Sequence, residues 1–374
     1  MADAQGTAAG PIVVLANGNL NGRVPRLVAD ELSRTHGRVV RVISLRHLNP
    51  LTAWPDERTR PHAVDVEHVD KAEAERIVRT AAVFVLPPFW DPYPSRLVAV
   101  ARKAGTPVVC VVADVGYGAR KLDATDPAAL PDRICVADPI TRGLLLRNGI
   151  PVELIRNAGS PQLDSILPRE PLPAPPSATP WRIGLLANPD GKREHLSDKH
   201  ARTDEGVLPA VHRALQSFPG ARLTIRTHPR QDPARIREAF PLGDATRIDP
   251  LEPRSTLPEF IAAQHLVVGS YSMGLMVARL LGRPAVSFQP RRTDDGLRRE
   301  IFAAWDVPVA ANEEELAAHL ATCMRSVDGP LSAGPLLYEP GASLQAIAKV
   351  VFEAEVMNRG RVHPDHAASM ERAS

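Results

Sequence analysis

The feature that most constrains the fold is a repeated alternation of short apolar runs with helical stretches. Runs of about four to eight residues that alternate with such stretches are typical of βαβ units, in which helices join parallel strands. We predict strands at 11–16, 38–44, 82–86, 107–113, 133–137, 152–156, 181–187, 222–227, 265–269, 284–288 and 307–310. We predict helices at 23–33, 95–104, 140–148, 206–217, 233–240, 272–281, 313–324 and 343–357. The sequence therefore predicts an α/β protein with parallel sheets.

A proline-rich segment, PREPLPAPPSATP at 168–180, divides the alternation into two halves of similar size. Six prolines in thirteen residues exclude a helix or a central strand. Because open α/β sheets bind ligands beyond the carboxyl ends of their strands, we expect a cleft between two Rossmann-like, doubly wound domains. The predicted parts are an N-terminal domain at 11–167, a linker at 168–180, a C-terminal domain at 181–342, a helix at 343–357 and a frayed or disordered tail at 358–374.

Composition excludes several other classes of protein. The net charge of +2 argues against a nucleic-acid-binding protein. Cys110, Cys135 and Cys323 are odd in number and form no CxxC, so we expect neither disulfides nor a metal site, with Cys110 and Cys135 as buried thiols. No apolar run approaches a membrane span and residues 1–10 lack a signal region, so we expect a cytoplasmic protein without integral membrane contact.

A basic loop follows one predicted buried strand. The run Arg226-Thr227-His228-Pro229-Arg230 comes directly after the apolar residues 223–225. His228 can donate from its ring to a phosphate oxygen, and Arg226, two positions away, shares its face if the strand continues. Arg230 adds a further positive charge. The alternative interpretation is an ordinary solvated strand end.

A hydroxyl-rich loop follows another buried strand about forty residues later. Gly269 permits close backbone approach, and Ser270, Tyr271 and Ser272 supply hydroxyls where a helix begins. The alternative is that Ser272 only caps this helix, and the two interpretations are compatible. Because helix starts hold anions, the basic and hydroxyl-rich loops at one sheet edge indicate a phosphorylated ligand, with a nucleotide or nucleotide-sugar considered first.

Two other loops supply candidate residues. Lys192 and Arg193 lie in NPDGKREH, after the first strand of the second half, and are candidates for phosphate contact or simply solvated. The loop NGNLNGR contains Asn19 and Arg23, but it is not GxGxxG and no acidic partner ends the second strand, which disfavours a dehydrogenase.

Two carboxylates also follow strong strands, Asp91 and Asp114. Carboxylates at strand ends facing a cleft are candidate general bases. Aspartate before proline, or in a glycine-rich loop, is also a common turn residue, and that interpretation stays open.

Three segments of the chain resemble the GT-B superfamily, which holds nucleotide-sugar glycosyltransferases and the non-hydrolysing UDP-N-acetylglucosamine 2-epimerases. Residues 137–164, ending in NAGSPQLD, resemble the family's end to the N-terminal domain. Residues 226–230 resemble the His-Pro element of bacterial capsule transferases, sialyltransferases and the epimerases. Residues 265–290 resemble the segment in which a phosphate-binding serine or glycine opens a helix that ends in Gly-x-Pro. The resemblance spans roughly residues 11–355.

The resemblance implies roles for particular residues. It implies that the C-terminal half grips the nucleotide and diphosphate through His228, Ser270 and Ser272. It also implies that Asp91 and Asp114 fall near acidic positions that the epimerases use in catalysis.

The chain also departs from the family's patterns. Where the epimerases carry paired glutamates, residues 276–279 read MVAR, and the ribose-gripping glutamate of many GT-B transferases is absent from the same helix. Residues 192–195, KREH, match the epimerase His-Arg-x-Glu-Asn only faintly.

The resemblance also implies a role for Arg23, which falls near an arginine that contacts phosphate in the family's first loop.

We therefore expect a metal-independent glycosyltransferase that takes a nucleotide-sugar as co-substrate, with no other cofactor and an acceptor that the sequence does not identify. Asp91 or Asp114 would deprotonate the acceptor. A nucleotide-sugar epimerase or hydrolase is the first alternative, and a non-catalytic nucleotide-sugar binding protein is the second. A homodimer is compatible with the sequence.

Overall fold

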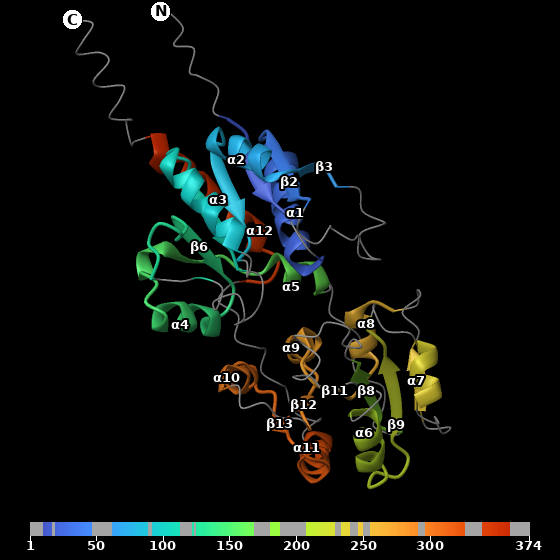
Figure 1. The fold of residues 1–374 in the computed structure, drawn as a ribbon. Coiled ribbons are helices and arrows are strands. Elements are labelled where there is room, and N and C mark those ends of the chain that lie inside the picture. The colour runs from blue at the N-terminus through green and yellow to red at the C-terminus, as the bar shows by residue number, and fades with distance from the viewer. Residues whose placement is uncertain are drawn as a thin grey trace, which may run out of the picture. The chain divides into compact units, whose positions relative to one another are not determined.

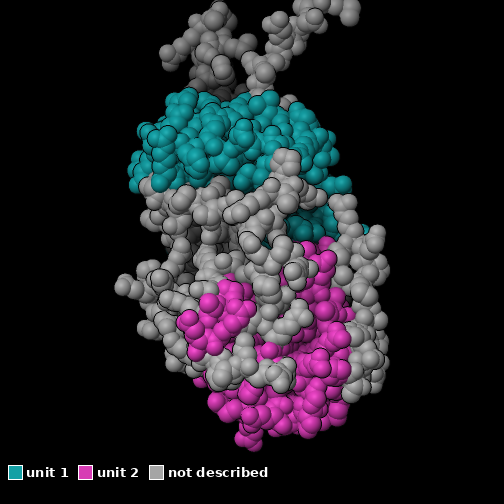
Figure 2. Space-filling view, turned by 90° about the vertical axis from the view of Figure 1, so that its right-hand side faces the viewer, with its two compact units in different colours: residues 1–165, 336–374 teal, residues 166–335 magenta. Residues whose placement is uncertain are grey.

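The computed structural model describes residues 10–16, 19–46, 62–88, 92–112, 122, 125–167, 180–187, 207–228, 233–239, 246–249, 255–290, 296–325 and 339–359. The chain divides into two compact units, which Figure 2 colours separately. Unit 1 comprises residues 1–165 and 336–374, and unit 2 comprises residues 166–335. The final helix, predicted as a separate element at 343–357, therefore belongs to the unit formed by the first half of the chain.

Unit 1 contains a parallel sheet with the strand order β3-β2-β1-β4-β5-β6-β7 among the described residues. The chain builds outward from β1 in one direction and then resumes beside β1 in the other, which is the doubly wound topology. The central strands are almost wholly apolar because helices cover both faces of the sheet. The strands are β1 (Ile12–Leu15), β2 (Val40–Leu45), β3 (Val66–Val69), β4 (Val83–Leu86), β5 (Val108–Val111), β6 (Arg133–Val136) and β7 (Ile155–Asn157).

Alternate residues of these strands pack into two separate cores. Val13, Phe84 and Ile134 face one core, which α2, α3 and α4 complete. Ile12 and Val85 face the other core, which α1 and α12 complete. The helices are α1 (Asn19–Arg34), α2 (Lys71–Arg79), α3 (Pro92–Lys103), α4 (Pro139–Arg147), α5 (Pro161–Ile166) and α12 (Ser343–Arg359), with a short 3-10 helix η3 (Val152–Leu154).

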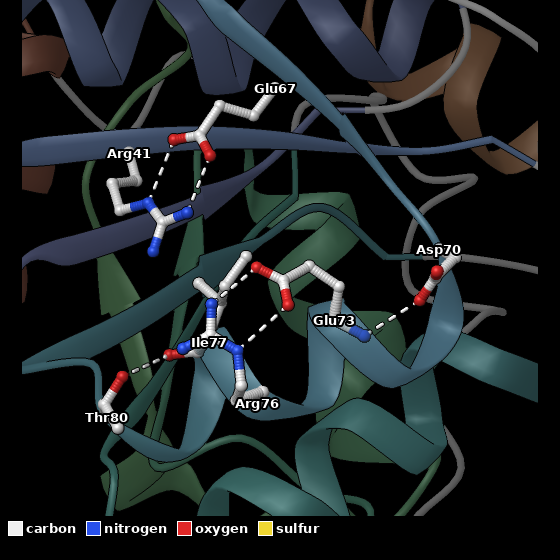
Figure 3. Close-up of polar contacts among 7 residues, drawn as sticks. All are labelled: Arg41, Glu67, Asp70, Glu73, Arg76, Ile77 and Thr80. Atoms are coloured by element: carbon white, nitrogen blue, oxygen red, sulfur yellow. Dashed lines mark hydrogen bonds and ion pairs between the residues drawn. The ribbon is translucent and has the colours of Figure 1, made fainter.

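Polar contacts define the edge strand β3 and the helix that follows it (Figure 3). Arg41 on β2 donates two hydrogen bonds to the carboxylate of Glu67 on β3, at 2.9 and 2.6 Å, and this contact lowers the pKa of Glu67. Asp70 accepts the Glu73 N–H at 2.9 Å and so caps α2. A second arginine pair, from Arg76 to Glu73, lies within the helix. Charged contacts thus add to the apolar packing of Val66 and Val69 at this edge of the sheet.

Unit 2 contains a second parallel sheet, with the order β10-β9-β8-β11-β12-β13 among the described residues. Ile183, Ile225 and Val268 face a core that α6, α7 and α11 complete. The strands are β8 (Arg182–Leu186), β9 (Arg222–Arg226), β10 (Thr246–Asp249), β11 (Leu266–Gly269), β12 (Ala285–Phe288) and β13 (Val309–Ala310). The helices are α6 (Leu208–Leu215), α7 (Pro233–Ala239), α8 (Leu257–Ala262), α9 (Met273–Leu280), α10 (Gly296–Ala304) and α11 (Glu313–Arg325).

Helix α12 returns the chain to unit 1, where Figure 1 shows it among the N-terminal elements. Its residues Ile347, Val351 and Ala354 are buried in the core beside α1. At its start, the carboxylate of Asp164 accepts hydrogen bonds from the backbone of Gly341 and Ser343 at 2.8 and 3.1 Å, and one from the Ser343 hydroxyl.

Near the end of α12, Arg38 donates to both carboxylate oxygens of the buried Glu355 at 2.8 Å. This bidentate pair ties α12 to the segment between α1 and β2. The two polar anchors, at Asp164 and at Glu355, fix opposite ends of the helix on unit 1.

The two parallel sheets confirm the predicted α/β fold class. Cys110 and Cys135 are confirmed as buried thiols, and burial raises the pKa of Cys135 to about 12. The predicted strand at 152–156 is wrong at its start, because Val152–Leu154 form a 3-10 turn and pairing begins at Ile155. The predicted linker, apart from residue 180, and the tail beyond residue 359 lie outside the described residues.

Candidate functional site

The carboxyl ends of β9, β8 and β11 lie side by side in unit 2. Leu186, at the end of β8, pairs with Arg226 of β9 on one side and with Gly269 of β11 on the other. The basic and hydroxyl-rich loops therefore leave the sheet at the same level, with only β8 between them. Strand order reverses between β8 and β11, and doubly wound sheets bind ligands at such a reversal.

On the β9 side, the candidate residues that the structure describes are Arg226 and His228. The Arg226 guanidinium donates to the carbonyl of Ser255 at 3.0 Å and lies over the ring of Phe260, 5.5 Å from its centroid. The Arg226 side chain is therefore held by Phe260 of α8 and by Ser255, which lies just before α8. His228 follows two residues beyond the end of β9 and is half-buried. Arg230 lies outside the described residues.

Two buried hydroxyls at this edge have no hydrogen-bond partner among the residues that the structure describes. Ser270 follows β11 and is 5% exposed, and Thr227 follows β9 and is 2% exposed. The hydroxyl oxygens of both residues lack any hydrogen-bonding contact. A buried polar group left unpaired costs about 1–3 kcal/mol, so two of them at one sheet edge require an explanation. A ligand with oxygen acceptors would satisfy both.

The Ser270 peptide is held from the neighbouring strand. The hydroxyl of Ser287, buried on β12, donates to the Ser270 carbonyl, and the side-chain amide of Gln289 donates to Ser287 Oγ at 2.8 Å. Because a trans peptide directs its C=O and N–H oppositely, the Tyr271 N–H points away from β12 and toward the β8 side. Ser287 and Gln289 thus orient the start of the hydroxyl-rich loop.

Helix α9 begins directly after this loop. Ser272 is its N-cap and accepts the Gly274 N–H at 3.1 Å, which leaves the Ser272 hydroxyl proton available as a donor. A Cβ at Gly274 would lie 2.5 Å from Leu186 Cδ1, so glycine lets the first turn of α9 approach the end of β8. The ring of Tyr271 packs edge-on against Phe302 of α10, at 5.5 Å between centroids.

The corresponding edge of unit 1 contributes fewer described residues. Asn19 is the first residue of α1, and Arg23 lies half-buried one turn later. Asp91, Asp114, Lys192 and Arg193 lie outside the described residues, so their predicted roles stay predictions. Among the residues that the structure describes, no cluster of three histidine, cysteine or acidic side chains is placed to hold a metal ion.

The same edge of unit 1 holds a buried carboxyl at Asp138, two residues beyond β6. Asp138 is 2% exposed and caps α4, accepting the Thr141 N–H at 2.8 Å and the Thr141 hydroxyl at 2.5 Å. Burial raises the pKa of Asp138, and the hydrogen bonds from Thr141 only partly oppose this shift. The native state therefore holds the Asp138 proton more tightly than the unfolded chain does.

We expect Asp138→Asn to change the pH dependence of stability. A raised native pKa means that wild-type stability falls as pH rises from the unfolded aspartate value of about 3.9 to the native pKa. Asparagine has no such titration and can still accept the Thr141 N–H. The difference in melting temperature, variant minus wild type, should therefore increase with pH across that window and then level off. Asp65→Asn, at an exposed position, is the control. A pH-independent difference would contradict the prediction.

Sequence reasoning missed three polar residues at the site. Thr227 stands between two predicted ligand residues, and its buried hydroxyl has no signal in the sequence. Ser287 interrupts the apolar strand AVSF, and a polar residue in a fully buried strand is a detectable signal. Gln289 follows two positions later on the same face.

Comparison with known proteins gives structural matches only. No known family profile and no curated protein matches the sequence. The structure resembles S. aureus MnaA solved with UDP, with a TM-score of 0.61 and 15% identity over 90% of this chain and 94% of that one. It also resembles the UDP-GlcNAc 2-epimerase of Methanocaldococcus jannaschii, solved with UDP-GlcNAc and UDP, with a TM-score of 0.59 and 11% identity over 91% and 99%.

A third similar structure is the wall teichoic acid polymerase TagF in a CDPG soak, with a TM-score of 0.56 and 14% identity over 93% of this chain and 90% of that one. Each match spans both halves of the chain. The chain therefore has the GT-B fold of two Rossmann-like domains, at 11–15% sequence identity to these structures. No helix in the described part of the chain is both long and apolar enough to cross a membrane.

Proposed function

We propose that this protein is a glycosyltransferase that binds a nucleotide-activated sugar at the carboxyl edge of the unit 2 sheet. The observation that carries the proposal is the pair of unpaired buried hydroxyls, Thr227 and Ser270, on either side of β8. His228 and the start of α9 supply further donors at the same edge. Two hydroxyl donors without acceptors among the described residues, at the strand-order reversal of a doubly wound sheet, suit a phosphorylated ligand.

The proposed chemistry is displacement of the nucleotide by an acceptor hydroxyl. Negative charge develops on the leaving phosphate, and His228, Arg226 and the α9 amides would stabilise it. Lys192, Arg193 and Arg230 carry further positive charge on the neighbouring loops in the sequence. We propose a metal-independent reaction because these groups would supply the charge that a metal ion otherwise provides. Asp91 or Asp114 would take the acceptor proton.

A nucleotide-sugar epimerase or hydrolase is the second candidate. It is favoured by the fold similarity to proteins named UDP-GlcNAc 2-epimerases. Helix α9, MGLMVARL, argues against it because it carries no carboxylate. Its one charged side chain, Arg279, is buried and donates to Asp306 and to the Trp305 carbonyl. The lack of carboxylates in α9 is also compatible with the third candidate, a protein that binds a nucleotide-sugar without turning it over.

A thermal-shift screen tests the proposed binding. The protein is screened against UDP, CMP, CDP, GDP, dTDP and their sugar conjugates. A ligand at 100 times its Kd stabilises the native state by about 2.7 kcal/mol, which gives a readable shift. We expect at least one strong hit, and Ser270→Ala should reduce that shift without lowering the melting temperature of the unliganded protein, because its hydroxyl makes no contact there. A flat screen would contradict the proposal.

Turnover separates the three candidates once the donor is known. Incubation of the hit with the protein alone should leave the sugar unchanged if the protein is a transferase that requires an acceptor. Formation of a different sugar, or release of free sugar, without an acceptor would identify the epimerase or hydrolase. Tight binding without turnover of any donor, with or without a panel of acceptors, would identify the binding protein.

A further inference from the structure

A groove on unit 1 lies away from the candidate site. Helix α12 forms one wall, and His36, after α1, and Arg133, at the start of β6, form the other; its volume is about 620 Å³. Arg133 is the first residue of β6, and His36 lies before β2. The wall of the groove that these two residues form is therefore at the amino ends of the strands. The ligand edge of a doubly wound sheet is at the opposite, carboxyl ends. The groove therefore does not belong to the nucleotide site proposed above.

The groove and its surroundings expose unusual apolar surface. Val356 is 67% exposed and Met357 41%, and both side chains line the groove. Phe352, which also lines the groove, is half-buried, with the guanidinium of Arg38 over its ring at 5.7 Å and the His36 ring edge-on at 5.0 Å. Apolar side chains that gather in this way mark interaction surfaces more often than isolated ones do.

The exposed row of α12 is self-complementary. Gln345, Lys349, Glu353 and Met357 follow one another every four residues, all are exposed, and all line the groove. Lys349 and Glu353 stand two residues on either side of Val351, and neither forms an ion pair within the described structure. A two-fold axis at Val351 that sets two α12 helices antiparallel would place each Lys349 opposite the Glu353 of the other copy.

The same two-fold axis also pairs the other two residues of the row with each other. Gln345 and Met357 stand six residues on either side of Val351, so each Met357 would lie beside the Gln345 of the other copy. Phe352 and Val356 would pack near the axis, where an interface is most fully desolvated. Rows spaced by four residues are the ridges that interlock in the commonest helix packing. Cyclic two-fold dimers require a patch of this self-complementary kind.

We propose that the α12 groove is the interface of a homodimer, in which a second copy of this chain lays its own α12 antiparallel across the first. The occupant is a second copy rather than an unrelated partner because the charges of the row complement themselves. Two salt bridges between Lys349 and Glu353 fix the register, and Phe352, Val356 and Met357 bury the apolar surface. The carboxyl edge of each unit 1 sheet stays accessible.

The proposal is tested by reversing the charges of Lys349 and Glu353. Sedimentation velocity of the full chain, over a range of concentrations, measures how far each variant dimerises. We expect the wild type to be a dimer. Lys349→Glu, and separately Glu353→Lys, should each set like charges opposite one another twice and weaken dimerisation on the order of tenfold or more. The double variant Lys349→Glu/Glu353→Lys restores opposite charges across the axis and should restore the dimer. Lys103→Glu makes the same charge change at an exposed position on α3 and should leave the dimer intact.

Three results would overturn the proposal. The first is a monomeric wild type, including one that instead binds vesicles of anionic phospholipid. The second is a dimer that persists in both single variants, because its interface would then lie elsewhere. The third is a double variant that stays monomeric although its circular dichroism and melting temperature match the wild type, because the charges would then not face each other. The test does not depend on nucleotide binding, so it stands whatever the ligand screen shows.

Discussion

Replacing His228 with alanine should weaken binding of the nucleotide identified in the screen by about 1–3 kcal/mol, or roughly 5- to 150-fold in Kd. His228 follows β9 at the level where β8 and β11 also end, one residue after Thr227 with its unpaired hydroxyl. A donor at that place can reach a phosphate, and hydrogen bonds to charged groups are the strong ones. Titration calorimetry of both proteins measures the difference directly.

A matched control makes this result specific. His319→Ala removes the same side chain from α11, a half-buried position in the same unit that is not at a strand end. Its nucleotide affinity should equal that of the wild type. Circular dichroism of the unliganded variant checks that His228→Ala is folded. Equal affinities for the wild type and His228→Ala would remove this residue from the site.

Much of the architecture follows from apolar periodicity alone. The buried central strands are runs such as IVVL and VVCV, whose burial on both faces of a parallel sheet makes them continuous in the sequence. Apolar periodicity did not predict β3 and β10, which lie at the edges of their sheets. Strand β3 reads VEHV, and Arg41 and Glu67 secure it through a salt bridge that no apolar pattern encodes.

Two missed helices did carry a signal. Helix α8 begins with a capping box in which Thr256 and Glu259 exchange hydrogen bonds, and the sequence TLPE shows the required spacing. Helix α2 begins with Asp70, three residues before Glu73, in the same spacing. Both helices are short, so apolar periodicity could not distinguish them, whereas their caps could have.

The candidate site was only partly predictable. The two loops were recognised from their strands, but the strand order was not, so the sequence could not place β8 between β9 and β11. Register depends on contacts far apart in the chain, such as Leu186 with Arg226 and Gly269. The same limit hides Ser287, whose hydroxyl meets the Ser270 carbonyl only once β11 and β12 pair.

Replacing Asp164 with alanine should destabilise unit 1 by about 2 kcal/mol. This carboxylate accepts the Gly341 N–H, the Ser343 N–H and the Ser343 hydroxyl, so it caps α12 from a distant part of the chain. Loss of a helix cap costs up to about 2 kcal/mol, and hydrogen bonds to charged groups contribute at the upper end of their range. Ser343 is fully buried, so water cannot fully replace the lost acceptor.

Hydrogen exchange shows where the stability is lost, because two units need not unfold together. In Asp164→Ala, protection should fall in α12 and in α1, which share one core, while the strands of unit 2 keep theirs. Asp164→Asn keeps one acceptor oxygen and should lose less, and Asp65→Ala, an exposed position in unit 1, should lose nothing. If α12 exchanges as in the wild type, then its apolar face and the Arg38–Glu355 pair alone hold it. The aspartate of the NAGSPQLD segment would then have no part in joining the two ends of the chain.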